Sequence, residues 1–207
     1  MKFEMGKLDW HQQHHLVTSL IAPLPIALIS TVGEEGYNAA PYSLVTPVGW
    51  EPPIVLFSSS LLKGKKKKHT VRNIEETGDF VINIMSEEHI RPTVRASANY
   101  ASNVNEIEKV GLTSMPAELV KSPLIVEAQS SLECRFFQEM TLNYGDKLRT
   151  LIFGEILLAH VKDEFCQDGT VEPAKLRLVG RVGDEAYCRI RDVFRLSVTT
   201  ASSKAKI

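Results

Sequence analysis

The sequence lacks long apolar runs, paired cysteines and an excess of charge, and each absence argues against a class of protein. No apolar run reaches the roughly 20 residues of a transmembrane helix, so we expect no membrane span. Three widely spaced cysteines, Cys134, Cys166 and Cys188, show neither CxxC nor zinc-ligand spacing, and we interpret them as reduced thiols. The formal net charge of −1 provides no overall attraction to nucleic acid or to a membrane surface. Residues 1–20 do not resemble a signal peptide, and we therefore expect a cytoplasmic protein.

Familiar catalytic motifs are absent as well. The sequence contains no Gly-rich dinucleotide fingerprint, Walker loop, GxSxG or HExxH motif. No pair of carboxylates stands out for acid–base chemistry, and we name no catalytic residue. His11, His14 and His15 have the i, i+3 and i+4 spacing of a helical metal site. Because no carboxylate or cysteine near them in the sequence completes a ligand set, we favour a surface helix there and predict no metal.

The chain is long enough to form a core of its own. Its 207 residues are 43% hydrophobic and 24% charged, and they contain no internal repeat or low-complexity linker. We expect a single domain over residues 1–207. Within it, residues 1–21 form a helical extension, capped by Asp9, whose apolar side packs on the body, and residues 201–207 form a frayed tail.

Alternation of apolar and polar residues predicts mainly extended structure. The predicted strands cover residues 23–32, 37–40, 53–57, 79–85, 128–142 and 149–161. Helices are predicted over 71–77, 87–98 and 104–110, and the second of them is expected to break at Pro92. Gly36 suits a hairpin turn, and Gly154 a bulge within a long strand. The regular crossover helices of parallel sheets are missing, so a closed or nearly closed antiparallel barrel is the expected architecture.

Residues 53–80 combine a strand, a loop rich in serine and lysine, and a helix. Ser58, Ser59 and Ser60 end the strand, and lysines follow at positions 63 and 65–68. Thr70 is the predicted cap of the helix and Gly78 its end. Hydroxyl groups, ammonium groups and free N–H groups at a helix start can hold a phosphate. A solvated loop with a simple cap is the alternative, whereas nucleic-acid binding is not expected because aromatic residues are not interleaved with the lysines.

A second group of polar residues lies in the first predicted hairpin. These short side chains at strand ends can hydrogen-bond the edge of a planar heteroaromatic ligand, and they are Ser30, Thr31, Asn38, Tyr42 and Ser43. Ordinary turn chemistry would use the same residue types, so the residues alone leave both interpretations open.

Several stretches together resemble one known family. PLPIALISTVGEEGYNAAPYS, PPIVLFSSS and KKHTVRNIEETGDFVINIMS are similar, in order and spacing, to the flavin reductase-like family with the FMN-binding split-barrel fold. Residues 105–112, 131–135 and 180–183 and Tyr187 extend the resemblance over about residues 23–196. Within the family, the sequence looks closest to the nitrilotriacetate monooxygenase component B or flavoredoxin-like group.

The resemblance implies a mainly β fold, a six-stranded antiparallel Greek-key split barrel with inserted helices. It also implies a homodimer with FMN near the subunit interface, and reduction of FMN by NADH or NADPH. A partner monooxygenase would receive the reduced flavin. A non-enzymatic FMN-binding protein for electron transfer or flavin storage would need the same grip and remains the alternative.

The resemblance also implies FMN-binding positions. Ser30 and Thr31 correspond to residues that line the isoalloxazine ring. The segment that contacts the ring and ribityl chain matches Asn38, Ala40, Pro41, Tyr42 and Ser43, the phosphate site matches Ser58, Ser59, Lys68 and Thr70, and Asn73 falls in the following helix. The sequence departs from the family pattern at Leu24, His69 and Asp184, where arginine, aspartate and glycine are common.

Overall fold

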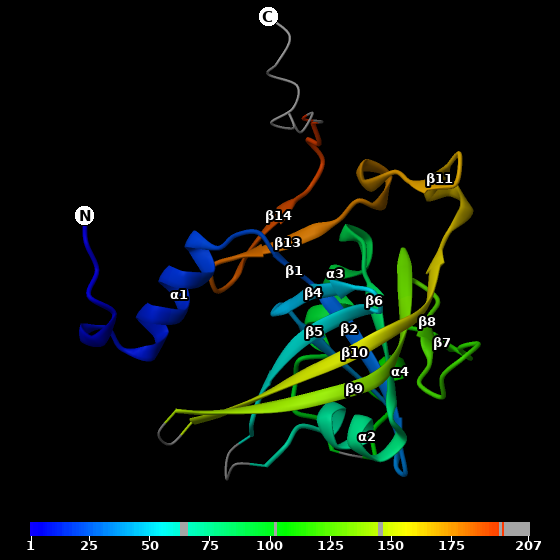
Figure 1. Cartoon of the computed structure of the whole chain (residues 1–207), viewed down its shortest axis with the longest axis horizontal. Helices are drawn as coiled ribbons and strands as arrows, with labels where there is room; N and C mark the ends of the chain where they lie inside the picture. The colour runs from blue at the N-terminus through cyan, green and yellow to red at the C-terminus, as the bar shows by residue number, and fades with distance from the viewer. Residues whose placement is uncertain (63–65, 102, 145–146, 195, 197–207) are drawn as a thin grey trace, which may run out of the picture.

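The computed structural model describes residues 1–62, 66–101, 103–144, 147–194 and 196. Its centre is a curved antiparallel sheet with strand order β3-β2-β6-β9-β10-β5-β4 (Figure 1). The strands are β2 (Ala27–Gly33), β3 (Gly36–Tyr42), β4 (Val45–Trp50), β5 (Pro53–Ser60), β6 (Asp79–Ile84), β9 (Ser130–Tyr144) and β10 (Lys147–Val161). The predicted mainly β, antiparallel architecture is confirmed, and the described sheet has seven strands where we expected six.

The sheet curls around an apolar interior because alternate residues of each strand point inward. Phe57 of β5, Phe80 of β6 and Ile152 of β10 are fully buried there, and the Phe57 and Phe80 rings meet edge to face at 5.5 Å. Gly154 leaves space for Phe80, and the pairing register of β9 and β10 shifts between Phe153 and Gly154. This confirms the bulge predicted at Gly154.

The hairpin of β2 and β3 is as predicted. Gly33 pairs with Gly36 across a two-residue loop, and Gly36 has a φ of 117°, which favours glycine. Strand β3 forms one edge of the sheet, and for this reason it tolerates Pro41, which lacks an N–H group.

Helix α2 (His69–Thr77) packs against β2 and contributes Val71 and Ile74 to the interior cluster. Its N-cap is Lys68, so the predicted cap at Thr70 is wrong; Thr70 is buried in the first turn and its hydroxyl contacts Asn38. Gly78 ends the helix in the left-handed conformation, with a φ of 78°, as predicted. The lysines at positions 63 and 65 lie outside the described residues.

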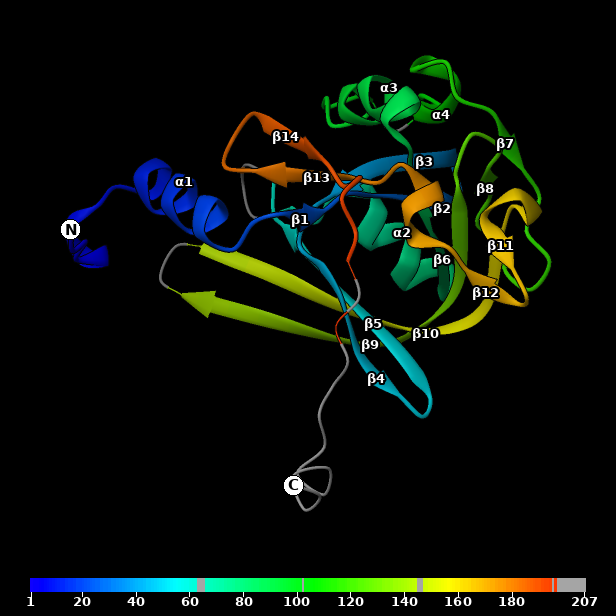
Figure 2. The same ribbon diagram turned by 90° about the horizontal axis from the view of Figure 1, so that it is seen from above.

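A second apolar cluster lies on the outer side of β2 and β3, where Figure 2 shows α3 and α4. The elements there are η3 (Glu87–His89), α3 (Ile90–Arg95), α4 (Glu106–Lys109), β7 (Ser114–Met115) and β8 (Leu124–Ile125). Pro92 lies in the first turn of α3, where a missing N–H is tolerated, and the helix continues past it to Arg95. The predicted break at Pro92 is therefore wrong. Asn105 caps α4 by accepting from the N–H of Ile107.

The N-terminal helix α1 (Trp10–Leu20) contacts a small sheet of β1 (Leu24–Pro25), β13 (Val179–Val182) and β14 (Ala186–Arg189). Asp9 caps α1, as predicted. The carboxylate of Asp184 lies 2.6 Å from His14 Nδ1 and 3.1 Å from His15 Nδ1, so these histidines fasten the helix. Trp10 and Leu20 are 53% and 75% exposed, contrary to the predicted packing of this helix on the body.

Of the remaining elements, η1 (Met5–Lys7) precedes α1. Four others join β10 to β13: η4 (Asp163–Phe165), β11 (Cys166–Gln167), β12 (Thr170–Val171) and η5 (Pro173–Leu176). Across the residues described, no helix has the length and apolar character needed to span a membrane. Likewise, in that part of the chain no three His, Cys, Asp or Glu side chains are grouped to hold a metal ion. The expected frayed tail lies outside the described residues.

Candidate functional site

A cleft of about 490 Å³ lies between β3, the start of α2 and the segment before α4. Its lining residues are Asn38, Ala40, Pro41, Leu62, Lys66, Lys68, His69, Thr70, Ala96, Ser97, Ala98, Asn99, Tyr100 and Glu106. Five of the predicted binding residues are thus brought together: Asn38, Ala40, Pro41, Lys68 and Thr70. The volume falls in the range of small-molecule sites, about 300–1,000 Å³.

The lysines near the cleft have different roles. Lys67 forms ion pairs with Glu75 and, at 3.2 Å, with Glu139, so its charge is compensated. Lys66 is exposed at the cleft, and Lys68 is half-buried there. Among the described lysines of this loop, the ammonium groups of Lys66 and Lys68 therefore remain available to an anion in the cleft.

Lys68 is the cation that is best placed within this cleft. Its Nζ lies 5.7 Å from the centre of the Tyr42 ring, within the range of a cation–π contact. Burial lowers the pKa of Lys68 and the nearby Arg149 lowers it further, while Glu106 acts in the opposite direction. A bound anion would offset both unfavourable effects, and this chemistry suits a phosphate group.

Hydrogen bonds join Asn38 to both neighbouring elements. Its amide lies 3.3 Å from Thr31 Oγ1 in β2 and 3.1 Å from Thr70 Oγ1 in α2. Asn73 of α2 donates to the same Thr31 hydroxyl at 3.1 Å. Thr31, Asn38, Thr70 and Asn73 therefore form one network that fixes α2 against the hairpin beneath the cleft.

Glu106 is a buried carboxyl group on the cleft wall. It is 6% exposed, and its Oε2 accepts from the Ala39 N–H at 2.9 Å. That N–H lies on the outer edge of β3, where none of the described strands provides a carbonyl. Burial raises the pKa of Glu106 to about 7, against the opposing effects of the Ala39 N–H and Lys68.

The remaining predicted residues are divided by strand alternation. Tyr42 is buried, with its hydroxyl 3.5 Å from Ser59 Oγ, and burial raises its pKa. Ser58, which precedes Ser59 in β5, instead accepts from Arg149 Nη1 at 3.2 Å. Successive residues of a strand point to opposite faces, so Ser58 and Ser59 do not converge on one point.

Ser30 and Thr31 are separated in the same way. Ser30 donates to the carbonyl of Pro123 at 2.5 Å and accepts from Asn83 Nδ2 at 2.9 Å, on the side of the sheet away from Thr31. Asn83 in turn accepts from the Ile125 N–H and from Ser131. The structure thus places Ser30 in a buried network that holds residues 123–125 to the sheet.

A smaller cavity of about 220 Å³ adjoins the cleft and shares Pro41 and Ser97 with it. It contains the predicted residues Tyr42 and Ser43, together with Ile26, Val94, Arg181, Asp184 and Tyr187. Arg181 and Tyr187 are cross-strand partners in β13 and β14, so the small sheet forms one wall. A second molecule next to one in the cleft could lie here.

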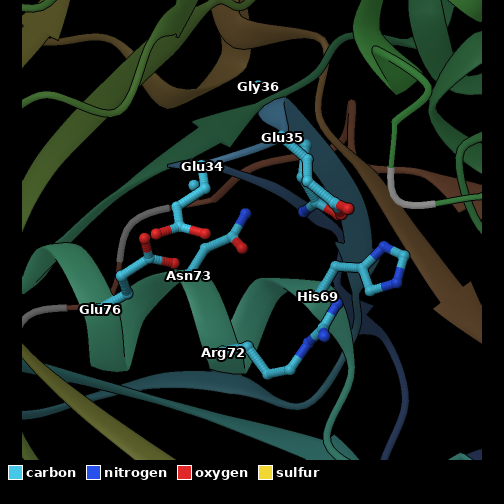
Figure 3. A pocket seen from close by; sticks show the side chains of 9 residues that line it. Glu34, Glu35, Gly36, His69, Arg72, Asn73 and Glu76 are labelled. Atoms are coloured by element: carbon cyan, nitrogen blue, oxygen red, sulfur yellow. The ribbon is translucent and has the colours of Figure 1, made fainter.

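A third cavity, of about 300 Å³, lies on the other side of Asn38, between α2 and the hairpin turn (Figure 3). Glu34, Asn73 and Glu76 lie on one side of it and His69 and Arg72 on the other (Figure 3). His69 lines both this cavity and the cleft, and burial lowers its pKa, as does the nearby Arg72. Asn73 packs so closely on Gly33 that a Cβ there would lie 2.5 Å from Asn73 Oδ1.

The sequence did not indicate Glu106 or the 96–100 segment as parts of the site, and it indicated Lys66 only as one lysine of the loop at 63–68. Asn105 is a helix-capping residue type, so a helix start was predictable near it. That the following carboxyl group meets a strand edge from elsewhere in the chain depends on the tertiary fold, and no local pattern reveals it.

Comparisons with known proteins agree with the fold. Residues 20–171 match the model of a family described as "Flavin reductase like domain". A curated relative, an uncharacterized protein of Aquifex aeolicus, is 34% identical over 96% of this chain and 100% of its own length.

Solved structures extend the similarity. Nitrilotriacetate monooxygenase component B from Bacillus cereus is 27% identical, with a TM-score of 0.89 over 95% of this chain and 98% of that chain. The 2-nitrobenzoate 2-nitroreductase NbaA of Pseudomonas fluorescens is 29% identical, with a TM-score of 0.85 over 97% and 98%. A split-barrel-domain protein of Shewanella frigidimarina, 24% identical with a TM-score of 0.83 over 96% and 100%, shares the fold. The resemblance seen in the sequence is thereby confirmed, and the chain belongs to the flavin reductase-like domain family.

Proposed function

We propose that the chain binds FMN in the cleft and reduces it with NADH or NADPH. The observation that carries this proposal is the partly buried ammonium group of Lys68, which lies beside Lys66 in a cleft of suitable volume. Membership of the flavin reductase-like family supports a flavin as the ligand. Charge-assisted hydrogen bonds from lysine to phosphate are among the stronger polar contacts in proteins, so the phosphate is the natural anchor.

The chain's own residues would bind and orient the reactants. Lys68 and Lys66 would hold the phosphate, and Ala40 and Pro41 give the cleft an apolar wall against which a ring can lie. A bound flavin supplies the hydride acceptor, so no side-chain acid or base is needed for that transfer. The adjoining cavity with Arg181 and Tyr187 offers a place for the nicotinamide donor.

The proposal is tested by anaerobic mixing of the FMN-loaded protein with NADH and, separately, with NADPH. We expect the flavin absorbance near 450 nm to bleach within seconds with at least one donor. Bleaching by dithionite but by neither nucleotide would instead identify an electron-transfer or flavin-storage protein. Failure to bind FMN would contradict both functions.

The phosphate anchor is tested by the double variant Lys68→Ala with Thr70→Ala. We expect FMN affinity to fall at least tenfold, since about 1.4 kcal/mol corresponds to a factor of ten and a charge-assisted bond contributes about 1.5–3 kcal/mol. Fluorescence titration measures the change. Riboflavin, which lacks the phosphate, is the matched control ligand, and its affinity should change far less. Equal FMN affinity in the two proteins would contradict the phosphate position.

Two further proposals concern what accepts the electrons. Similarity to the monooxygenase component B supports transfer of reduced flavin to a partner monooxygenase. Similarity to the nitroreductase NbaA supports a nitroaromatic acceptor as a second candidate. Steady-state oxidation of NADH with FMN alone, and then with 2-nitrobenzoate added, separates the two because only a nitroreductase consumes the nitro compound stoichiometrically.

We also propose that the chain acts as a homodimer. Large apolar side chains are exposed on β9 and on α1, and a second copy of the chain would cover them.

A further inference from the structure

Asn38 lies between a carboxyl group and two hydroxyl groups. One end of its amide is 3.1 Å from Glu106 Oε2, and the other end is 3.3 Å from Thr31 Oγ1 and 3.1 Å from Thr70 Oγ1. A hydroxyl group can donate or accept, whereas a carboxylate can only accept. The protonation state of Glu106 therefore decides which way the Asn38 amide is oriented.

Two arrangements pair the Asn38 amide with Glu106. With Glu106 ionised, Asn38 Nδ2 donates to Glu106 Oε2, and Asn38 Oδ1 accepts from the hydroxyls of Thr31 and Thr70 and from the Ala39 N–H at 3.2 Å. With Glu106 protonated, its O–H donates to Asn38 Oδ1, and Nδ2 donates to Thr31 and Thr70. In this second arrangement the Thr70 proton no longer points to Asn38, and its possible acceptors are the Tyr42 hydroxyl and an oxygen bound in the cleft that Thr70 lines.

Ionisation of Glu106 disfavours anion binding through its charge as well as through the orientation of the Asn38 amide. Its carboxylate lies in the cleft that contains Lys66 and Lys68, so an anion held by these lysines is repelled when Glu106 is ionised. Because Glu106 is 6% exposed, water screens this repulsion weakly. Proton uptake would remove the repulsion and leave the Ala39 N–H with its acceptor.

From this arrangement we propose that Glu106 is a positioning residue that takes up a proton when an anion binds in the cleft. The proton turns the Asn38 amide and the Thr70 hydroxyl toward the anion-binding arrangement. This inference rests on the proposed function only in naming the FMN phosphate as the anion. It makes the affinity for FMN dependent on pH near neutrality.

Linkage between proton binding and anion binding sets the direction in which FMN affinity changes with pH. Below a pH of about 7 Glu106 already carries a proton in the ligand-free protein, so affinity is constant there. Above it, binding must bring in the proton, and affinity falls by up to about tenfold per pH unit for one proton. The affinity stops falling once the pH exceeds the pKa of Glu106 in the anion-bound protein.

Other titratable groups face Glu106 and must be separated from it. They are Lys66, Lys68 and His69 at the start of α2, Tyr42 on β3, and Tyr100 before α4, with Arg149 beyond Lys68. The pKa of His69 is lowered from its ordinary 6.5, so that imidazole is largely neutral above this pH. The pKa of Tyr42 is raised from 10.0, so its phenol keeps its proton. A Lys68→Arg background removes the contribution of the lysine, because arginine does not deprotonate in proteins.

The experiment measures the dissociation constant of FMN from pH 6.5 to 8.5 for the wild type, Glu106→Gln and His69→Gln. Glutamine keeps an acceptor for the Ala39 N–H but cannot titrate. We expect affinity to fall with pH above 7 in the wild type, in His69→Gln and in the Lys68→Arg background. In Glu106→Gln the pH dependence of the wild type should be lost, and the ratio of the two constants cancels the titration of FMN itself.

Calorimetry in two buffers of different ionisation enthalpy counts the protons taken up by the wild type, and it does not depend on any variant folding. We expect uptake of a substantial fraction of one proton at pH 7.5. No uptake, or an equal pH dependence in wild type and Glu106→Gln, would overturn the inference. Sulfate, whose charge is constant over this range, competes for the same lysines and should show the same dependence if the inference holds. FMN binding with a flat pH profile overturns this inference alone, whereas failure to bind FMN or sulfate overturns it together with the proposed function.

Discussion

Gly154 of β10 occupies a place where the barrel interior has no room for a side chain. A Cβ at this position would lie 2.3 Å from Phe80 Cζ and 3.3 Å from Cys134 Cβ. Phe80 is fully buried and is held by the Phe57 ring, so it cannot turn toward solvent. We expect Gly154→Ala to lower the free energy of unfolding by about 1–3 kcal/mol, which is the usual effect of overpacking. Urea denaturation measures it.

Gly49 of β4 is the matched control because a Cβ there would meet nothing nearer than the Pro52 carbonyl at 3.7 Å. Gly49→Ala should be neutral or slightly stabilising, since alanine loses less backbone entropy than glycine on folding. A Gly154→Ala variant as stable as Gly49→Ala would show that Phe80 does not pack where the structure places it.

At the residue scale, the sequence predicts best where a local rule applies. Gly36, Gly78 and Gly154 were assigned to a turn, a helix end and a bulge because each interrupts a regular pattern, and the structure confirms all three. The cap predicted at Thr70 is wrong because the helix begins earlier, with Lys68 as its N-cap, and Thr70 in the first turn contacts Asn38 instead. Burial of Glu106 had no sequence signal, since its partner Ala39 comes from a distant strand edge.

Among the elements, the connection between β7 and β8 depends on the neighbouring strands for its backbone hydrogen bonds. Glu133 of β9 is fully buried and accepts from the N–H groups of Glu118 at 2.9 Å and Leu119 at 2.6 Å. His160 of β10 lies 2.6 Å from the same carboxylate. Asp79 of β6 holds Ser122 in a similar way. Two carboxylates thus provide this loop with the hydrogen-bond acceptors that the carbonyl groups of a paired strand would otherwise provide.

We expect Glu133→Leu to destabilise the protein by about 3 kcal/mol, because it removes the carboxylate that accepts from two loop N–H groups and pairs with His160. Urea denaturation measures the loss, and hydrogen exchange at residues 116–123 should rise with it. Glu118→Gln is the control, since Glu118 contributes only its backbone N–H and its side chain is exposed. Equal stability of the two variants would contradict the role of the buried carboxylate.

The same carboxylate predicts a pH dependence. Burial would raise the pKa of Glu133, but the Glu118 N–H, His160 and the Leu119 N–H together lower it below its ordinary 4.5. A lowered pKa means that the unfolded chain binds the proton more readily. The stabilisation is therefore present above about pH 4.5 and is lost as the pH falls through the folded-state value. In Glu133→Leu this acid-dependent part should be absent.

The sequence predicted which strands form better than it predicted how those strands pair. Strong alternation predicted the long strands β9 and β10, and their observed bounds, Ser130–Tyr144 and Lys147–Val161, lie within two residues of the predictions. The pairing of β2 with β6 and of β6 with β9 joins residues far apart in the chain, and periodicity carries no information on such partners. The cleft depends on this pairing, so its shape was not predictable although five of its residues were.

In the whole molecule, the hairpin of β9 and β10 projects from the body on the same side as α1 in both views (Figures 1 and 2). Phe137, Met140 and Leu142 of β9 are exposed on it, and Leu20 and Ile21 are exposed at the end of α1. Burying side chains of this size contributes about 1.5–3 kcal/mol each. A second copy of the chain supplies apolar surface of the same kind, which favours a symmetric dimer.

We expect light scattering to give twice the chain mass of 23.1 kDa for the wild type. Phe137→Lys places a charge in the proposed interface, where it would be desolvated, and should shift the protein to 23.1 kDa at micromolar concentration. Val171→Lys alters an exposed apolar residue of β12, at the opposite end of the molecule in Figure 2, and should leave the dimer intact. A monomeric wild type, or a dimer unaffected by Phe137→Lys, would mean that the exposed face of β9 is not the surface that joins two copies.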